Sequence, residues 1–425
     1  MTDNWSGDHV HEDEEPPFEP PGSSDDDGWE IADPEFGGPQ RAGVVSAVSE
    51  SDLVAVNQAA EGFFRDSLPG SWVPGYLAGR GFDPSVQQLW HAGHAPAGWV
   101  TLTRHLRALG FTDLVIHAAG LARRSRLGTL IDTFRDRAIL PIRAADGTVA
   151  AFIGRAPSGA PPGTPKYLNS PRTALYDKST ILFGLYEARD ELAGGARLVI
   201  VEGPLDAIAI TAASAGRYVG VSPCGTALTR KHAAALRAAA DLSPTGVLVA
   251  FDSDPAGQRA AIRAYHVLVQ LTTETSAVIL PSGRDPAQIL AEHGAGCLAE
   301  YLAICSQPLA DLVTDTELAR WSRWLPHPEG QLNALRAVAQ VIASMPPSHV
   351  GRQVARLASQ LALDHAIVTD AVLSALPGVI DHGGAAGPRQ QARRWPTDAA
   401  AARPAPGRRS QYGGSMPSHQ AGRGP

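Results

Sequence analysis

Acidic side chains follow short apolar runs in the middle of this chain. They are Glu202, Asp206, Asp252, Asp254 and Asp285. Two carboxylates about 4 Å apart repel each other by roughly 4 kcal/mol at an effective dielectric constant near 20, so a cluster of them needs a counterion. Mg²⁺ or Mn²⁺ fits, because these hard cations bind carboxylate oxygens and keep waters that phosphate oxygens can replace. The acids therefore predict a divalent-metal site suited to phosphate chemistry.

The acids are expected to converge because most of them come at the ends of predicted parallel strands. From Arg197 the sequence alternates strand-like apolar runs with helical stretches. The runs are LVIV at 198–201, YVGVS at 218–222, GVLVAF at 246–251 and AVIL at 277–280. Four such units predict a parallel sheet with helices on its faces. The carboxyl ends of parallel strands share one edge, and the two-residue period of a strand points Asp252 and Asp254 to the same side.

Helix capping is the alternative role for each of these acids. An acidic side chain just before a helix can be its N-cap, and Asp254 before Pro255 suits that role. A single acid would favour capping. Acids at the ends of successive strands favour the metal site.

The region before the sheet combines strand patterns with positive charge. The stretches ILPIR and TVAAFIGR, joined by AADG, predict a hairpin because Asp-Gly is a turn signal. Of the 36 Lys and Arg residues only three are lysines, at 166, 178 and 231. The lysine ammonium is a compact charge, whereas the arginine guanidinium is planar. This difference matters where a side chain binds a phosphate near a reacting centre, so the rare lysines are candidates for that role.

Composition limits the class of protein. The chain has 425 residues and is 44% hydrophobic, which allows two or three domains with sizeable cores. It has no apolar run of roughly 18 residues and begins with an acidic stretch, so we expect a cytoplasmic protein without a membrane partner. Its three cysteines have no CxxC spacing, so we expect no zinc.

These patterns predict an α/β protein with five regions. The ends are predicted to be disordered because they lack apolar periodicity, the first being acidic and the last rich in Gly, Pro, Ala and Arg. The regions are a disordered acidic arm at 1–45, a basic α+β subdomain at 46–195, a parallel-sheet α/β subdomain at 196–305, a small helical subdomain at 306–376 and a disordered basic tail at 377–425.

Several motifs together resemble a known family. In the second half, ExxxD after the first strand is followed by CGTALT, FDSDPAG and LPSGRDP, an order similar to that of the TOPRIM domain. The preceding half contains FRDRAILPI, GTVAAFIGR, KYLNSP and LYDKSTILFGLYEA, which resemble the basic half of the catalytic core of bacterial DnaG-type primases. GYLAGRGF is similar to that family's first segment. The resemblance covers about residues 50–375, and KYLNSP with a second lysine twelve positions on is its most specific part.

The resemblance implies a role for each matching residue. Glu202, Asp252 and Asp254 match the family's catalytic metal-binding acids, and Asp206 and Asp285 match further acids of its motifs. The residues implied to bind template DNA and the triphosphate of the incoming nucleotide are Arg135, Arg137, Arg155, Lys166, Asn169, Lys178, Gly225 and Thr226. A tight turn without substrate contact is the alternative for Gly225 and Thr226.

The function implied is that of a DNA primase, a nucleotidyltransferase that makes short RNA primers in DNA replication, including that of mobile elements. It would use two metal ions, Mg²⁺ or Mn²⁺, with single-stranded DNA as template and ribonucleoside triphosphates as substrates. The family usually has a zinc ribbon and a helicase-binding domain, and this chain resembles a stand-alone core without them. A replicative helicase or a separate template-recognition protein would be a further partner.

Two other functions remain open on the sequence. A TOPRIM metal-dependent nuclease would use the same acids but leaves Lys166 and Lys178 without a role. A non-catalytic module that binds single-stranded nucleic acid would keep the cations but would not need the acids. The presence of both groups favours the primase.

Overall fold

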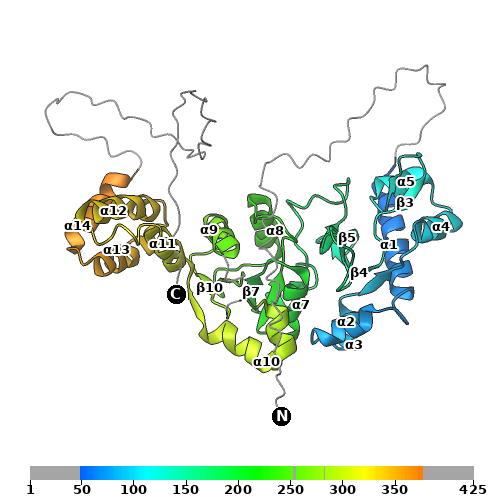
Figure 1. Ribbon diagram of the computed structural model, residues 1–425, viewed down its shortest axis with the longest axis horizontal. Coiled ribbons are helices and arrows are strands. Elements are labelled where there is room, and N and C mark those ends of the chain that lie inside the picture. Colours follow the sequence, from blue (N-terminus) through cyan, green and yellow to red (C-terminus); the bar gives the residue numbers. More distant parts are fainter. Residues whose placement is uncertain (1–47, 252–254, 282, 377–425) are drawn as a thin grey trace, which may run out of the picture. The chain divides into compact units, whose positions relative to one another are not determined.

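The computed structural model describes residues 48–251, 255–281 and 283–376 (Figure 1), and every structural statement below concerns these residues. The predicted acidic arm, the predicted basic tail and two of the predicted metal ligands, Asp252 and Asp254, lie outside them. The described residues form two compact units, the first ending at Leu309 and the second beginning at Ala310. None of the described helices combines the length and the apolar character needed to cross a membrane.

The first unit begins with helices. They are α1 (Glu50–Asp66), α2 (Val73–Gly79), α3 (Pro84–Leu89), α4 (Thr101–Ala108) and α5 (Asp113–Ala118). Helix α1 starts in a capping box, in which the Ser49 hydroxyl accepts from the Asp52 backbone N–H and the Asp52 carboxylate accepts from the Ser49 N–H. Its buried side chains, among them Val56, Ala60 and Phe64, recur at helical spacing and face the first sheet.

The first sheet is antiparallel and has the strand order β1-β4-β5-β6. Its strands are β1 (Gly93–Ala95), β4 (Arg137–Arg143), β5 (Val149–Arg155) and β6 (Tyr167–Asn169), and a separate pair is formed by β2 (Ala122–Arg124) and β3 (Leu130–Asp132). The predicted hairpin is confirmed, because β4 and β5 pair antiparallel. Its turn contains Gly147, which has a positive φ of 88° that glycine adopts without strain.

The second sheet has the strand order β11-β10-β9-β7-β8. Its strands are β7 (Arg197–Ile200), β8 (Tyr218–Val221), β9 (Val247–Val249), β10 (Thr275–Val278) and β11 (Ser306–Pro308). The predicted α/β fold is confirmed, since β7, β8, β9 and β10 are parallel, and β11 adds an antiparallel edge. Strand order reverses at β7, with β8 on one side and β9 on the other. Ligands of open α/β sheets usually bind at the carboxyl ends of the strands at such a reversal.

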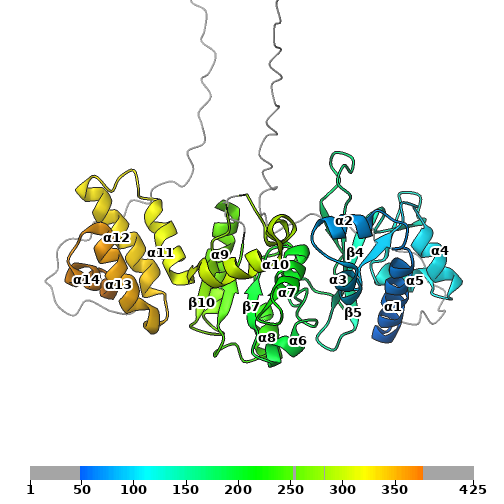
Figure 2. The same ribbon diagram turned by 90° about the horizontal axis from the view of Figure 1, so that it is seen from below.

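Helices connect the strands of this sheet. They are α7 (Pro204–Ala213), α8 (Arg230–Ala239), α9 (Pro255–Leu268) and α10 (Pro286–Ile304), and α6 (Arg189–Ala193) lies just before β7. Helices α7 and α10 pack side by side, which both Figure 1 and Figure 2 show. Because α7 directly follows β7 and α10 follows β10, their N-terminal ends bring residues after two different strands together.

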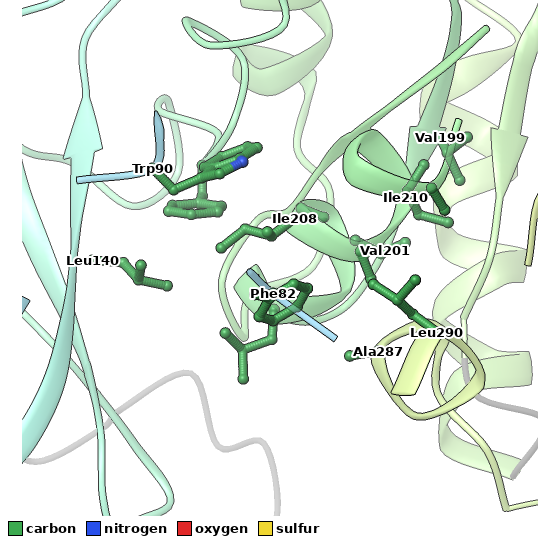
Figure 3. Close-up of a cluster of buried hydrophobic side chains, with 14 of the residues drawn as sticks. Phe82, Trp90, Leu140, Val199, Val201, Ile208, Ile210, Ala287 and Leu290 are labelled. Atoms are coloured by element: carbon green, nitrogen blue, oxygen red, sulfur yellow. The ribbon is translucent and has the colours of Figure 1, made fainter. Parts of the chain in front are cut away.

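One hydrophobic cluster joins the two sheets. Figure 3 shows Leu140 of β4 and Trp90 on one side and Ile208 of α7 and Leu290 of α10 on the other. Trp90 stacks on Phe183 with ring centroids 5.3 Å apart. The subdomain boundary near residue 195 stays a prediction, because this cluster contains side chains from both sides of it.

The second unit is helical. Its helices are α11 (Leu309–Ala319), α12 (Pro328–Ala343), α13 (Pro347–Leu361) and α14 (His365–Ala375). Buried apolar residues of α12, α13 and α14 form its core. Asp311, which is 3% exposed, accepts hydrogen bonds from Arg352 and Gln353 of α13. This buried network joins α11 to the rest of the unit.

Gly220 of β8 allows the closest packing between a strand and α7. A Cβ atom at this position would lie 2.4 Å from the carbonyl oxygen of Ala207. We expect Gly220→Ala to destabilise the protein by about 1–3 kcal/mol, because packed backbone cannot move aside. Thermal unfolding should show a decrease in Tm of about 2–6 °C.

Gly62→Ala is the matched control for this prediction. Gly62 lies within α1, and a Cβ there would meet nothing within 4 Å. Alanine is favoured over glycine by about 1 kcal/mol inside a helix, so the Tm should stay or rise. An unchanged Tm in Gly220→Ala would contradict the close approach.

Candidate active site

Three of the predicted metal ligands, Glu202, Asp206 and Asp285, lie in described segments that follow β7 and β10 of the second sheet. Glu202 is the second residue after β7, and its carbonyl oxygen accepts a hydrogen bond from the Ser222 hydroxyl at 2.7 Å. Asp206 lies in the first turn of α7, and its Oδ1 accepts from the backbone N–H of Ala287 at 3.3 Å. Because Ala287 is in the first turn of α10, Asp206 of one helix reaches the N-terminus of another.

Asp285 is the N-cap of α10. Its Oδ1 accepts from the backbone N–H of Gln288 at 2.7 Å, and the Gln288 side chain accepts from the Asp285 N–H at 3.0 Å. Asp285 therefore caps a helix, which is the alternative to metal binding that the sequence allows for an acid just before a helix. Asp206 and Asp285 are thus brought to the same helix end. A metal-binding role for Asp285 stays a prediction.

The described acids provide the right donor chemistry for a hard divalent cation, because all of them offer carboxylate oxygens. Across residues 48–251, 255–281 and 283–376, no group of three or more His, Cys, Asp or Glu side chains is arranged to hold a metal ion. Two of the five predicted ligands, Asp252 and Asp254, are not among these residues. The chemistry of the donor set therefore fits Mg²⁺ or Mn²⁺, and the complete ligand set stays a prediction.

Aromatic and basic side chains form a wall made by α2, β5 and β6. We call Tyr76, Arg80, Arg155, Lys166 and Tyr167 the aromatic–basic wall. The guanidinium carbon of Arg155 lies 5.6 Å from the ring centroids of both tyrosines. Arg80 lies 5.7 Å from the Tyr76 ring, and the Lys166 ammonium lies 5.9 Å from the Tyr167 ring. Such cation–π contacts hold the cations in place without neutralising them.

The aromatic–basic wall lies near the acids. Burial raises the pKa of the Tyr167 phenol, and the negative charge of Asp206 raises it further, whereas Arg155 and Arg80 act in the opposite direction. The packing agrees with this, because Tyr167 lies against the hydrophobic cluster that contains Leu205 and Ala207, the residues on either side of Asp206. The structure therefore brings the acidic strand end and the basic region together, although they are separated in sequence.

Buried polar atoms without hydrogen-bond partners occur in this wall and at the neighbouring Asn169. In the described part of the chain, Tyr76 Oη, Arg155 Nε and Asn169 Oδ1 are buried and have no hydrogen-bond partner. Asn169 Nδ2 donates to the carbonyl oxygen of Cys224 at 3.0 Å, which sets the orientation of the amide. Buried polar groups usually have partners. Because all three atoms are shielded from solvent, their direct contact with a ligand stays a prediction.

Arg135 and Arg137 have structural partners. The guanidinium of Arg135 stacks on Trp99, with Cζ 4.0 Å from the ring centroid, and Nη1 donates to the Asp132 carbonyl oxygen at 3.0 Å. Arg137 is 5% exposed, and its Nη1 donates to the carbonyl oxygens of Gly154 and Pro165, each at 3.0 Å. Burial, followed by the charges of Arg155 and Arg135, lowers the pKa of Arg137. Direct contact of Arg137 with a ligand stays a prediction.

The remaining predicted ligand contacts lie in turns and on the surface. Lys166 and Lys178 are exposed. Gly225 is exposed and has a φ of 83°, next to Cys224 with a φ of 51°. The Thr226 hydroxyl donates to the Pro223 carbonyl oxygen at 2.9 Å, which stabilises the turn. Asn169 connects this turn to β6, so these residues lie on neighbouring parts of the site.

Comparison with known proteins identifies the family. A model described as "DNA primase catalytic core, N-terminal domain" matches residues 66–189, and one described as "Toprim-like" matches residues 199–290. The crystal structure of the RNA polymerase domain of Mycobacterium tuberculosis primase DnaG is 31% identical, with a TM-score of 0.65 over 73% of this chain and 99% of that chain. The chain belongs to the family of DnaG-type primase catalytic cores.

Full-length relatives of this DnaG-type core extend the comparison. The DNA primase of Streptomyces coelicolor is 35% identical over 348 residues, which are 82% of this chain and 50% of the relative. That of Mycolicibacterium smegmatis is 35% identical over 301 residues, which are 69% of this chain and 46% of the relative. The chain thus spans about half the length of the curated relatives it matches. Toprim and primase catalytic domains imply the use of divalent metal ions.

Tyr76, Arg80 and Tyr167 were not expected from the sequence to have a role, although all three lie in the DnaG-like motifs. A signal was available. Tyr76 and Arg80 are four residues apart and therefore share a helix face. Tyr167 and Arg155 are direct cross-strand partners in the β5–β6 pair, but that register is not readable from the sequence.

Arg155→Met should weaken the binding of phosphate ligands. Methionine keeps an unbranched stem and removes the charge. A charge-assisted hydrogen bond contributes about 1.5–3 kcal/mol, so we expect affinity to fall about tenfold or more for single-stranded DNA or for ATP with Mg²⁺. If DNA is the ligand, the slope of log affinity against log salt should decrease by about 0.7. Fluorescence anisotropy and calorimetry measure these quantities.

The control is Arg217→Met. Arg217 also lies over a tyrosine, 6.0 Å from the Tyr218 ring, but at the opposite end of the parallel strands. The Arg217→Met variant should bind single-stranded DNA and ATP with the same affinity as the unmodified protein. Unchanged affinity of Arg155→Met for both ligands would show that the aromatic–basic wall is not a phosphate site.

Proposed function

We propose that this chain is a primase-type nucleotidyltransferase that synthesises short RNA primers on single-stranded DNA. The observation that carries the proposal is that Tyr167 of the aromatic–basic wall packs against the hydrophobic cluster that contains Leu205 and Ala207, the two neighbours of Asp206 in α7. An acidic edge suits metal-assisted chemistry at a phosphate, and a facing row of cations suits a triphosphate or a nucleic-acid backbone. The names of the relatives, which are DNA primases, support the same activity.

The acids would hold the metal ions in this reaction. Glu202, Asp206 and Asp285, with Asp252 and Asp254, offer only carboxylate oxygens, which favour Mg²⁺ or Mn²⁺ over softer metals. Bound divalent ions supply charge neutralisation at the transferring phosphate and activation of the attacking hydroxyl. Glu202 suits this task because a buried hydroxyl fixes its backbone.

The aromatic–basic wall and the exposed lysines would bind the substrates. Lys166 and Lys178 present exposed ammonium groups that can bind a triphosphate, while Arg155 adds a positive charge beside Tyr76 and Tyr167. Tyr76 and Tyr167 offer ring faces for stacking. Because most of these contacts involve charge and not base edges, template binding should depend strongly on salt and weakly on sequence.

Template DNA and ribonucleoside triphosphates are the proposed partners. A DnaG primase catalytic domain with a structure described as bound to single-stranded DNA is 27% identical, with a TM-score of 0.63 over 75% of this chain and 98% of that chain. This supports single-stranded DNA as the ligand here. We add a replicative helicase or a separate template-recognition protein as a proposed partner, and the cytoplasm, where bacterial DNA is replicated, as the proposed location.

The test is primer synthesis from labelled ribonucleotides on single-stranded DNA with Mn²⁺ or Mg²⁺. We expect short RNA products that disappear on addition of EDTA. Glu202→Gln should lower the rate about 100-fold or more, because it removes a charge that holds metal at the reacting phosphate. Lys166→Ala should lower kcat/KM about tenfold or more through lost phosphate binding.

Two surface variants are matched controls for these substitutions. Glu300→Gln removes an exposed acid of α10, and Arg336→Ala removes an exposed cation of α12. Both should keep full activity. Cleavage of the DNA without RNA products would favour a TOPRIM nuclease, and salt-sensitive binding without either reaction would favour a non-catalytic module.

A further inference from the structure

The connection between β8 and α8 contacts both sides of the candidate site. We define the β8–α8 connection as residues 222–232, which include the first turn of α8. Two of its side chains, Ser222 and His232, are both 0% exposed. Each forms a hydrogen bond to the backbone carbonyl of a predicted site residue, Glu202 in one case and Lys178 in the other.

Ser222 holds the acidic side. Its hydroxyl donates to the Glu202 carbonyl oxygen at 2.7 Å and accepts from the Cys224 backbone N–H at 3.0 Å. Its backbone pairs with Phe183 in both directions, at 2.9 and 3.0 Å. The hydroxyl is therefore fixed from several sides. It sets the position of the peptide that carries Glu202 between β7 and α7.

His232 holds the basic side. Its Nε2 lies 2.9 Å from the Lys178 carbonyl oxygen, and its Nδ1 accepts from the Thr229 backbone N–H at 3.2 Å. Since Nδ1 accepts, the proton of the neutral ring is assigned to Nε2, which donates to Lys178. The Thr229 hydroxyl adds a second bond to this loop, to the Ser179 carbonyl oxygen at 2.6 Å.

Neither side chain can reach a substrate, because both are fully buried. Each acts through the residue whose carbonyl it binds. A third bond, from Asn169 to Cys224, connects the same segment to β6 of the aromatic–basic wall. The β8–α8 connection thus forms hydrogen bonds with the backbone of Glu202, with the backbone of Lys178 and with the Asn169 side chain of β6.

We propose that the β8–α8 connection sets the position of Glu202 relative to the loop that carries Lys178 and Ser179, with Ser222 as a positioning residue for Glu202 and His232 as one for Lys178. This inference rests on the proposed function, because the roles of Glu202 and Lys178 belong to it. It predicts that the two residues affect different kinetic constants. Glu202 acts at the reacting phosphate, whereas Lys178 binds the substrate before reaction.

The kinetic test uses Ser222→Ala, His232→Leu and His232→Gln in the full chain. Ser222→Ala should lower kcat about tenfold and change KM for ATP less than about twofold. His232→Leu should raise KM for ATP about fivefold or more with a smaller effect on kcat. His232→Gln should restore much of the loss, because the glutamine amide can donate to the Lys178 carbonyl.

Ser214→Ala is the matched control for Ser222→Ala. Ser214 is 1% exposed, and its hydroxyl also donates to a backbone carbonyl, that of Ile210 at the end of α7. Loss of this hydroxyl removes a buried hydroxyl-to-carbonyl hydrogen bond within the last turn of α7 and touches no predicted site residue. It should leave kcat and KM unchanged. Equal kinetic effects of the two alanine variants would overturn the proposal.

The pH dependence gives a readout that a general packing role would not affect. Burial lowers the pKa of His232, while the hydrogen bond to the Lys178 carbonyl oxygen and the negative charge of Asp177 act to raise it. Asp177 forms ion pairs with Arg172 and Lys231. The contribution of a neutral buried histidine is complete above its unfolded pKa of about 6.5 and is lost as pH falls from there through the folded pKa. The rise of KM for ATP at acidic pH should therefore be smaller in His232→Gln than in the unmodified protein.

Hydrogen exchange separates this inference from the proposed function, since it needs no catalysis. Amides 177–181 should exchange faster in His232→Leu, and amides 201–206 should exchange faster in Ser222→Ala. If the unmodified protein makes no primers but these two segments respond as expected, the positioning role holds and the proposed function fails. If primers are made and neither the kinetic separation nor the local exchange appears, the positioning role fails.

Discussion

A buried guanidinium underlies the aromatic–basic wall, the proposed substrate-binding side of this protein. Arg137 lies in β4, and its two hydrogen bonds to the carbonyls of Gly154 and Pro165 join β5 to the segment that leads into β6. Lys166, Tyr167 and Asn169 stand at the end of that segment. Arg137 also lies close enough to Arg135 and Arg155 for their charges to lower its pKa. Positive charge is therefore assembled before any ligand arrives, and preorganised charge binds a phosphate without the cost of rearranging the protein.

The acidic side depends on a different constraint, the topology of the parallel sheet. Strand order reverses at β7, so the residues after β7 are next to those that follow β9 and those that start α7. Close packing maintains this arrangement, because Gly220 lets β8 lie directly against α7, and α7 lies against α10. Asp206 can then reach the N-terminus of α10. The hydrophobic cluster shared by the two sheets brings the acidic end near the aromatic–basic wall.

Much of the fold could be predicted because its signals are local. Apolar runs such as LVIV end at Gly-Pro, and an Asp-Gly turn joins two apolar runs, so strands and hairpin could be located without tertiary information. The short antiparallel strand β11, SQP, has no such pattern, and only its pairing with β10 reveals it. The candidate acids were found for the same reason as the strands, since each follows a recognisable pattern.

The sequence by itself determined the order of strands and helices, the positions of the acids and cations and, through KYLNSP and the TOPRIM-like motifs, the family. Only the tertiary structure decided which contacts are made by side chains of the same type. Arg137 and Arg155 are chemically identical, yet Arg137 is buried and donates to two carbonyl oxygens of neighbouring segments, whereas Arg155 lies over the rings of two tyrosines and donates to the adjacent Ala156 carbonyl oxygen. Asp206 and Asp285 are both acids near a helix start, yet only Asp285 caps its own helix. The physical reason is that burial, cross-strand register and contact between distant segments depend on how the whole chain packs, and no local pattern contains that information.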